Sequence, residues 1–591
     1  MIGTRRRLGL LATTLSVLLL TGACASLPES SSPQAIGTLA TAVPGTSVES
    51  PASGREPDLL VRDFVKASTD PSNRHAAARQ YLTKDASARW DDAASAVIVD
   101  KIDTLSASRT SSEAVYTIRV NKVGRLDPGG LYVPEEGSFE ARMTLTLTDG
   151  EWRISDLPPG VIMERPQFLG AYQRKSLFFL DPTSQTVVPD LRWISGGQDQ
   201  VAAQLIGLMI DGPKAALAPA VRNELGNGVS VIGPITKADG KPGQVGVGLG
   251  GVRINFRLDN PMDAATRGLF AAQVIWTLAN ADVAGPYVLE IDGEPLDAAH
   301  ADGWTTADVA STNPLATTSA TVGLHALRNG SLVSVTEQEA APVPGFAGTA
   351  GNLTAAALSR DGKLVAAVAD TARPDPATRF DLSLGTYEGS VPVLEGSAIT
   401  RPSWELDNNA VWAAVNGNTV VRVVREPGTG RVSVTNVDVG ALTSVGSTIS
   451  ELRLSRDGVR AAMIIDGKVY LAVVVRTASG VYALTSPRAV ASGLGSTALS
   501  LDWSNSDTIV IARSGADIPV VQVAIDGSRM DALPSGNLTA PVTSVDASPT
   551  TEYVADARAV FQLNNNDPAG DRRWREVTVL TGQKAIPVLP G

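Results

Sequence analysis

The sequence predicts a multidomain protein in which two α+β domains precede an all-β propeller. Length is the first reason, because the chain has 591 residues and folded domains contain roughly 100–200 residues each. Composition is the second: 43% hydrophobic and 19% charged residues are typical of a folded chain rather than a disordered one. The third is a change of pattern along the chain, from mixed helical and strand-like segments to a repeated strand–turn–strand unit.

The amino terminus is typical of a secretory signal peptide. Three consecutive arginines precede an apolar run from Leu8 to Leu20, and small residues then lead to Cys24. The apolar run is too short to span a bilayer comfortably. We therefore expect residues 1–23 to be removed during export.

The single cysteine of the chain, Cys24, lies directly after the small residues that would precede the cleavage site. This arrangement resembles the lipobox of bacterial lipoproteins, although Thr21 stands where leucine is usual. Two or three acyl chains, at ~0.8 kcal/mol per buried methylene, would anchor the protein stably. We predict that Cys24 carries palmitate or a similar acyl chain, which places the protein on the extracytoplasmic face of the cell membrane. The alternative is a secreted protein with an unmodified cysteine.

Residues 24–54 form the predicted lipid-anchored tether. After Cys24 the segment is rich in Ser, Thr, Ala and Pro and shows no apolar periodicity, as flexible linkers do. A flexible coil of this length has a root-mean-square reach of ~30 Å. The folded domains are therefore expected to work just outside the membrane.

Residues 55–170 predict the first α+β domain. Apolar residues at helical spacing indicate two helical segments between residues 57 and 93, separated by a turn at residues 70–72. Strand-like runs follow at residues 114–120 and 139–147. Helices followed by a curved antiparallel sheet resemble the cone of the nuclear transport factor fold.

Residues 171–300 predict a second α+β domain. A strand pair within residues 177–194 is followed by a helix with one buried face, which ends before Gly212. Asn260 and Pro261 suit the N-cap and the first position of a second helix, and a strand and turn follow it. These blocks in this order resemble a GerMN domain, a type with no established catalytic residues.

Residues 318–591 contain an internal repeat that predicts the propeller. Five times, an apolar stretch leads through a polar turn into a second apolar stretch, at steps of 44 to 50 residues. About four short strands fit in each step, which is one propeller blade. Five repeats allow five blades, or six if one is degenerate, and we expect the run at 324–335 to close the ring with the C-terminal blade. The equivalent positions are Ser359, Glu405, Ser455, Ser504 and Ser548.

No catalytic constellation, metal site or cofactor site is predicted. One cysteine excludes thiolate metal sites, and three scattered histidines, His75, His300 and His325, do not indicate a metal centre or a catalytic base. The glycines from Gly246 to Gly251 superficially match a dinucleotide loop, but the alternating apolar residues favour a hairpin. With 61 acidic and 50 basic residues, the chain lacks the basic footprint of a nucleic-acid-binding protein. We expect no enzyme activity, no cofactor and no nucleic-acid partner.

The lipobox cysteine, the tether, the cone, the GerMN-like domain and the propeller, in this order, resemble the LpqB lipoprotein family of actinobacteria. The resemblance implies a non-enzymatic accessory of the MtrA–MtrB two-component system. Such a lipoprotein contacts the extracytoplasmic part of the sensor histidine kinase MtrB and so influences cell-wall metabolism and division. No partner-binding residue is transferred to this sequence. The residues favour the same class, since an anchored protein without catalytic groups works by binding.

Two other functions remain open from the sequence. A module that binds envelope glycan or lipid would have an apolar or aromatic-lined cavity in the cone. An envelope enzyme, such as a glycosidase or a lactonase, would have converging carboxylates or a metal at the mouth of the propeller.

Overall fold

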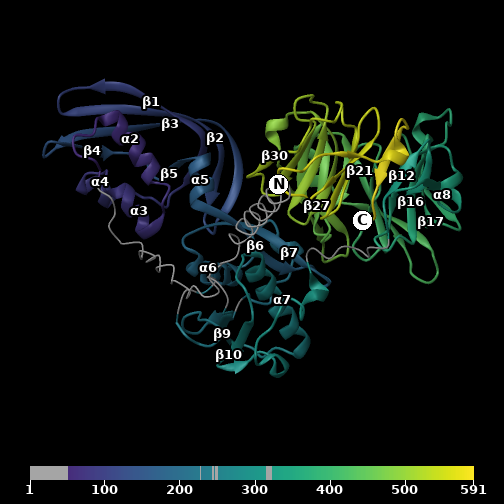
Figure 1. Ribbon diagram of the computed structural model, residues 1–591, viewed down its shortest axis with the longest axis horizontal. Helices are drawn as coiled ribbons and strands as arrows, with labels where there is room; N and C mark the ends of the chain where they lie inside the picture. The colour runs from purple at the N-terminus through teal and green to yellow at the C-terminus, as the bar shows by residue number, and fades with distance from the viewer. Residues whose placement is uncertain (1–50, 227, 243–244, 246–249, 314–321) are drawn as a thin grey trace, which may run out of the picture. The chain divides into compact units, whose positions relative to one another are not determined.

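The computed structural model describes residues 51–226, 228–242, 245, 250–313 and 322–591. Residues 51–591 form one compact unit, in which three domains follow one another along the chain (Figure 1). Within these described ranges, no helix combines the length and the apolar character that a membrane span requires.

The first domain is a five-stranded sheet in the order β4-β3-β2-β1-β5, with short helices packed against it (Figure 1). Helix α2 presents Leu60, Val61, Phe64 and Val65 to the core because these residues share one face. The helices are α2 (Pro57–Ala67), α3 (Ser72–Arg79), α4 (Lys84–Arg89) and α5 (Arg165–Ala171). The strands are β1 (Ala96–Arg109), β2 (Glu113–Asp127), β3 (Leu131–Thr148), β4 (Glu151–Asp156) and β5 (Val161–Glu164).

The predicted strands at residues 114–120 and 139–147 are parts of β2 and β3. Residues 57–93 contain three helices rather than the two expected segments. The third begins after Thr83, whose hydroxyl accepts a 3.2 Å hydrogen bond from the amide of Ala86. Strand β1 was not predicted, since most of its second half is exposed and lacks the alternation that marks a half-buried strand.

Aromatic side chains fill the inner face of this sheet. The ring of Trp90 is 4% exposed and meets Phe64 edge-on at 5.5 Å. Phe168 continues the packing, with its ring centroid 4.5 Å from that of Trp193 and 6.1 Å from that of Tyr132. These rings form part of the buried core of the first domain.

The second domain packs helices α6 and α7 against two sheets, one in the order β11-β10-β9-β8 and one formed by β6 and β7. The predicted strand pair and the predicted end of the first helix are confirmed: Gly212 adopts φ +96 directly after α6. The helices are α6 (Gln198–Asp211) and α7 (Ala264–Asn280). The strands are β6 (Tyr172–Leu180), β7 (Val187–Ser195), β8 (Val229–Val231), β9 (Val252–Leu258), β10 (Tyr287–Ile291) and β11 (Glu294–Pro295).

The predicted start of α7 was wrong. Asp263, not Asn260, is the N-cap, because its Oδ1 accepts a 2.7 Å hydrogen bond from the amide of Thr266. An ionised carboxylate also interacts favourably with the positive end of the helix dipole. Asn260 and Pro261 therefore lie in the preceding loop.

The third domain is a propeller in which six four-stranded sheets are described (Figure 1), so the blade count is six. Each repeat position found in the sequence lies in or directly after the innermost strand of its blade. Five blades are each made of four consecutive strands. The first two are β15 (Leu353–Leu358), β16 (Leu364–Asp370), β17 (Phe380–Thr386) and β18 (Ser390–Gly396), then β19 (Ser403–Trp404), β20 (Ala410–Val415), β21 (Thr419–Arg425) and β22 (Val432–Val437). The other three are β23 (Ile449–Leu454), β24 (Arg460–Ile465), β25 (Lys468–Arg476) and β26 (Tyr482–Ala489), then β27 (Ala498–Asn505), β28 (Thr508–Arg513), β29 (Val520–Ala524) and β30 (Met530–Ala532), and finally β31 (Ser544–Ala547), β32 (Thr551–Ala555), β33 (Val560–Asn564) and β34 (Arg575–Glu576).

The sixth blade combines strands from the start and the end of the domain. It has the order β14-β13-β12-β35, made of β12 (His325–Arg328), β13 (Ser331–Val335), β14 (Ala340–Pro342) and β35 (Ala585–Val588). Strands β12 and β35 are antiparallel, with His325 opposite Val588. As predicted, residues 324–335 close the ring together with the C-terminal end of the domain.

Candidate functional site

The predicted modification site, Cys24, lies outside the described residues, and so do Gly246 to Leu249 of the predicted glycine hairpin. The described end of that glycine segment, Gly251, leads directly into strand β9.

The three histidines lie in three separate settings. His75 packs beside Trp90, with ring centroids 5.8 Å apart, and burial lowers its pKa. His300 stacks on Trp304 at 3.7 Å, and burial lowers the pKa of His325 on β12. Over the described ranges of the chain, no group of three or more His, Cys, Asp or Glu side chains could hold a metal ion.

Charged side chains converge instead on the inner strands of the propeller. Arg453, Asp502 and Asp546 each lie two residues before an equivalent position of the repeat, on β23, β27 and β31. In two other blades the same position holds Ala357 and Ser403. The sequence analysis missed this group, although the repeat alignment places these charges at a position that is elsewhere small.

Two arginines bind three carboxylates in this group. Arg401 donates from Nε to Oε1 of Glu451 (3.0 Å) and from Nη1 to Oδ2 of Asp546 (3.1 Å). Arg453 donates from Nε to Oδ1 of Asp502 (2.9 Å). The three acidic residues are at most 9% exposed. These five residues are called the axial cluster below.

The pKa values of the two aspartates of the axial cluster are shifted in opposite directions. Burial raises the pKa of Asp546, and the adjacent Asp502 raises it further. Burial acts in the same direction on Asp502, but Arg453, Arg401 and the hydrogen bond with Asp546 together outweigh it and lower the pKa of Asp502. Repulsion between the two neighbouring buried carboxyl groups therefore favours the protonated form of Asp546 over that of Asp502.

A cavity of about 420 Å³ opens onto the axial cluster, and Arg401 and Glu451 line it. Converging carboxylates were the feature expected of an envelope enzyme, but here Oε1 of Glu451 accepts a hydrogen bond from Nε of Arg401 and lies 2.8 Å from Nη2 of the same ion-pair partner. The second oxygens of the aspartates also have partners: Asp502 accepts from the amide of Ala547 (2.9 Å). The contacts therefore join the blades and leave no free acid–base pair among these groups.

The hairpin of β6 and β7 is fixed to both neighbouring domains. Trp193 on β7 donates from Nε1 to Oδ2 of Asp526 in the propeller (3.0 Å), and its backbone amide donates to the carbonyl of Gly130 in the first domain (2.8 Å). Arg460 of β24 donates to the carbonyl of Pro189 on β7. Strand β7 is therefore a common attachment point of the three domains.

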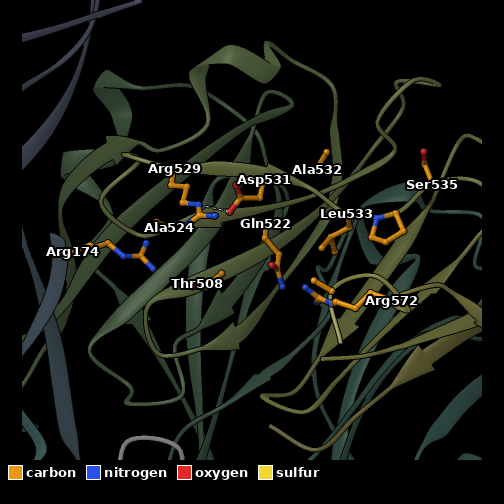
Figure 2. Close-up of a pocket in the computed structure, with 12 residues that line it drawn as sticks. Arg174, Thr508, Gln522, Ala524, Arg529, Asp531, Ala532, Leu533, Ser535 and Arg572 are labelled. Atoms are coloured by element: carbon orange, nitrogen blue, oxygen red, sulfur yellow. Dashed lines mark ion pairs between the residues drawn. The ribbon is translucent and has the colours of Figure 1, made fainter. Parts of the chain in front are cut away.

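A basic pocket lies where this hairpin meets the outer strands of the propeller (Figure 2). Its volume is about 700 Å³, and β6, β28, β29 and β30 contribute to its walls. Arg529 and Asp531 form a 2.7 Å ion pair on one side. The guanidinium groups of Arg174 and Arg572 point into the pocket from opposite sides (Figure 2). The sequence analysis did not predict this pocket, because its residues come from segments with no local motif in common.

Comparison with known families gives three matches along the chain. Residues 50–169 match the model of the Lipoprotein LpqB N-terminal domain, and residues 330–590 match the Lipoprotein LpqB beta-propeller domain. Residues 176–297 match the family described as sporulation and spore germination. The matches follow the order of the three domains of the fold.

Comparison with curated proteins gives relatives that align over nearly the whole chain. Lipoprotein LpqB of Rhodococcus jostii (strain RHA1) is 71% identical over 98% of this chain and 97% of its own length. Lipoprotein LpqB of Nocardia farcinica (strain IFM 10152) is 48% identical over 99% of this chain and 98% of its own length. Lipoprotein LpqB of Mycolicibacterium smegmatis (strain ATCC 700084 / mc(2)155) is 44% identical over 97% of this chain and 98% of its own length.

Proposed function

The chain belongs to the LpqB lipoprotein family, and from this premise we propose that it is a non-enzymatic accessory of a membrane sensor histidine kinase of the MtrB type. In this proposal the protein is held on the extracytoplasmic face of the membrane by acyl chains on Cys24. It contacts the extracytoplasmic domain of the kinase and so influences cell-wall metabolism and division.

The observation that carries the anchoring is the position of the single cysteine. Cys24 follows a basic start, an apolar run and small residues, and the relatives that match over the whole chain are lipoproteins by name. One acyl chain gives only marginal binding to a membrane, whereas two or more give stable anchoring. Diacylation of Cys24 would therefore suffice without help from the net charge of the chain, which is negative.

The fold supports binding as the activity. The carboxylates of the axial cluster are occupied by arginines, so the group that resembles an acid–base site serves packing. Strand β7 fastens three domains into one compact unit, which suits a protein that offers preformed surfaces to a partner. Loops at the rims of a propeller are typical places for such contacts.

The proposed mechanism is a shift in the population of kinase states. A bound accessory favours one state of the sensor domain only if it binds that state more tightly than the other. Anchoring both proteins in one membrane raises their effective concentration, so a modest intrinsic affinity is sufficient.

Anchoring is tested by mass spectrometry of the mature amino terminus, comparing the natural chain with Cys24→Ala. We expect an acylated Cys24 as the first residue of the natural protein and release of the variant from the membrane fraction. An unmodified Cys24 on a membrane-free protein would contradict the anchoring.

The partner is tested separately, by in-cell crosslinking and recovery of the natural chain from membranes. We expect a sensor histidine kinase among the crosslinked proteins, and a lower yield for Cys24→Ala at equal expression because the effective concentration falls. Repeated recovery of peptidoglycan fragments without any kinase would contradict the accessory role while leaving the anchor intact.

A further inference from the structure

The basic pocket has a net positive charge, whereas the chain as a whole has a net negative charge. Three arginines and one aspartate line it, whereas the whole sequence has 50 basic and 61 acidic residues. The ion pair between Arg529 and Asp531 is largely exposed and adds little net charge. The excess of two positive charges therefore comes from Arg174 and Arg572.

Arg174 is held at the pocket without an acidic partner. It lies opposite Trp193 in the β6–β7 register, and directly opposed residues of an antiparallel pair share a face of the sheet. Because Trp193 is bonded to Asp526 of the propeller, this register also directs Arg174 toward the propeller. Among the described residues, no carboxylate or other hydrogen-bond acceptor contacts the guanidinium group of this half-buried side chain.

Arg572 faces Arg174 across the pocket (Figure 2) and is only partly satisfied. One guanidinium nitrogen donates to Oδ1 of Asn565 at 2.7 Å, while its buried Nε has no partner. A buried, unpaired donor of this kind is unfavourable unless another group accepts from it. Within the described chain no carboxylate lies at ion-pair distance from Arg572, although the buried carboxyl group of Glu552 is near enough to interact with its charge.

Between the two arginines the pocket offers both polar and apolar contacts. Gln522 lies between the two arginines (Figure 2), and Thr508, Leu533 and Pro534 also line the pocket. The amide nitrogen of Gln522 donates to Glu552 beneath it, which leaves the amide oxygen to accept from a ligand. A volume of about 700 Å³ lies within the range of small-molecule sites.

We propose that the basic pocket binds a small organic phosphate monoester, with its phosphoryl group held by Arg174 and Arg572 and its organic part against Leu533 and Pro534. The charge selects this class: a phosphate monoester carries about two negative charges at neutral pH, which matches the excess of two positive charges. The planar guanidinium group forms paired hydrogen bonds with phosphate oxygens. Because apolar side chains also line the pocket, it should bind an organic phosphate ester more tightly than inorganic phosphate.

The site is tested by isothermal titration calorimetry on the full mature chain in detergent micelles. The probes are glycerol 3-phosphate, glucose 6-phosphate, adenosine monophosphate, inorganic phosphate, succinate and glucose. We expect at least one phosphate ester to bind in the submillimolar range, more tightly than inorganic phosphate, and to weaken as salt rises. Glucose and succinate should bind at least about tenfold more weakly.

Three variants separate this site from general electrostatics. Arg174→Gln loses no internal partner, so its fold should be unchanged while the affinity falls at least about tenfold. Arg572→Gln should lose affinity similarly, and a thermal unfolding curve checks its fold. The exposed neighbour Arg573 provides the control Arg573→Gln, which should bind as the natural chain does.

The outcomes either support or overturn the proposal. Tight binding of an ester that is lost in Arg174→Gln and kept in Arg573→Gln supports it. The proposal is overturned if no phosphate probe binds at about 10 mM, if succinate binds as tightly as the esters, or if all three variants weaken binding equally.

Discussion

The indole nitrogen of Trp193 donates a 3.0 Å hydrogen bond to the carboxylate of Asp526 across the boundary between the second domain and the propeller. Both residues are at most 5% exposed. The other oxygen of Asp526 accepts from the amide and the hydroxyl of Ser528 (3.0 and 2.6 Å), so the carboxylate is already oriented. The same indole packs on Phe168 of the first domain. One side chain therefore contributes to the attachment of all three domains.

Replacing Trp193 by phenylalanine should weaken this attachment. The variant Trp193→Phe keeps an aromatic ring but removes the donor, leaving a buried carboxylate oxygen of Asp526 unpaired. A hydrogen bond to a charged group contributes about 1.5–3 kcal/mol, and we expect a loss of stability of that size in chemical denaturation. Limited proteolysis should also cut earlier between the domains. Trp152→Phe in the first domain is the control, and an equal loss there would contradict the assignment.

Two neighbouring glycines at the tip of the β2–β3 hairpin give a matched test of the contact with β7. Gly129 and Gly130 both have φ +75, so alanine at either position carries a similar left-handed strain of about 1–2 kcal/mol. At Gly130 a Cβ would lie 2.3 Å from the carbonyl oxygen of Trp193, whereas at Gly129 it would meet the side chain of Arg192 at 3.1 Å. We expect Gly130→Ala to lower the unfolding midpoint clearly more than Gly129→Ala. Equal midpoints would mean that the hairpin tip does not rest on β7.

The two aspartates of the axial cluster should respond oppositely to pH. The pKa of Asp502 is lowered, so its stabilising effect is present above its unfolded value near 4 and is lost as pH falls through the folded pKa. The pKa of Asp546 is raised, so keeping it buried becomes costlier as pH rises above about 4 toward the folded pKa.

Urea denaturation between about pH 2 and pH 8 measures this difference. Relative to the natural chain, Asp502→Asn should lose stability as pH rises to about 4 and stay level above it, whereas Asp546→Asn should gain stability as pH rises above about 4, each by at most about 1.4 kcal/mol per pH unit. Parallel pH profiles for the two variants would contradict the opposite pKa shifts of Asp502 and Asp546.

Removing Arg401 should be strongly destabilising. Arg401→Ala leaves Glu451 and Asp546 buried without their cation, and breaking one partner of a buried ion pair costs about 3–5 kcal/mol. The exposed Arg431 provides the control, since Arg431→Ala should change stability by less than about 0.5 kcal/mol. Thermal unfolding of both variants checks the prediction, and a small effect at Arg401 would mean that water reaches the cluster.

The sequence predicted the fold well wherever a local residue pattern is compatible with only one structure. The repeat positions Ser359 and Ser455 precede Asp-Gly turns, so the hairpin between the first two strands of those blades was readable. The start of α7 was not, because Asn260 and Asp263 both satisfy the rules for an N-cap. Only the hydrogen bond from Thr266 to Asp263 decides between them.

The charged groups were harder to predict because their members lie close together in space but far apart in the sequence. Asp502 and Asp546 belong to different blades, and Arg401 reaches both Glu451 and Asp546 only because the ring closes. Arg174 and Arg572 likewise come from different domains. The repeat alignment contained a signal for the aspartates, but nothing local in the sequence pairs the two arginines.

The pairing of β12 with β35 also has a consequence for how the protein matures. These partners lie at opposite ends of the propeller sequence, so the last contact to form has a very high contact order, which slows folding. In a chain that folds as it emerges from its amino terminus, the edge of β12 stays unpaired until β35 at the far end of the domain is available. During that interval the edge is open to strands of other molecules, so the unclosed ring is the stage at which a chaperone would protect this protein most.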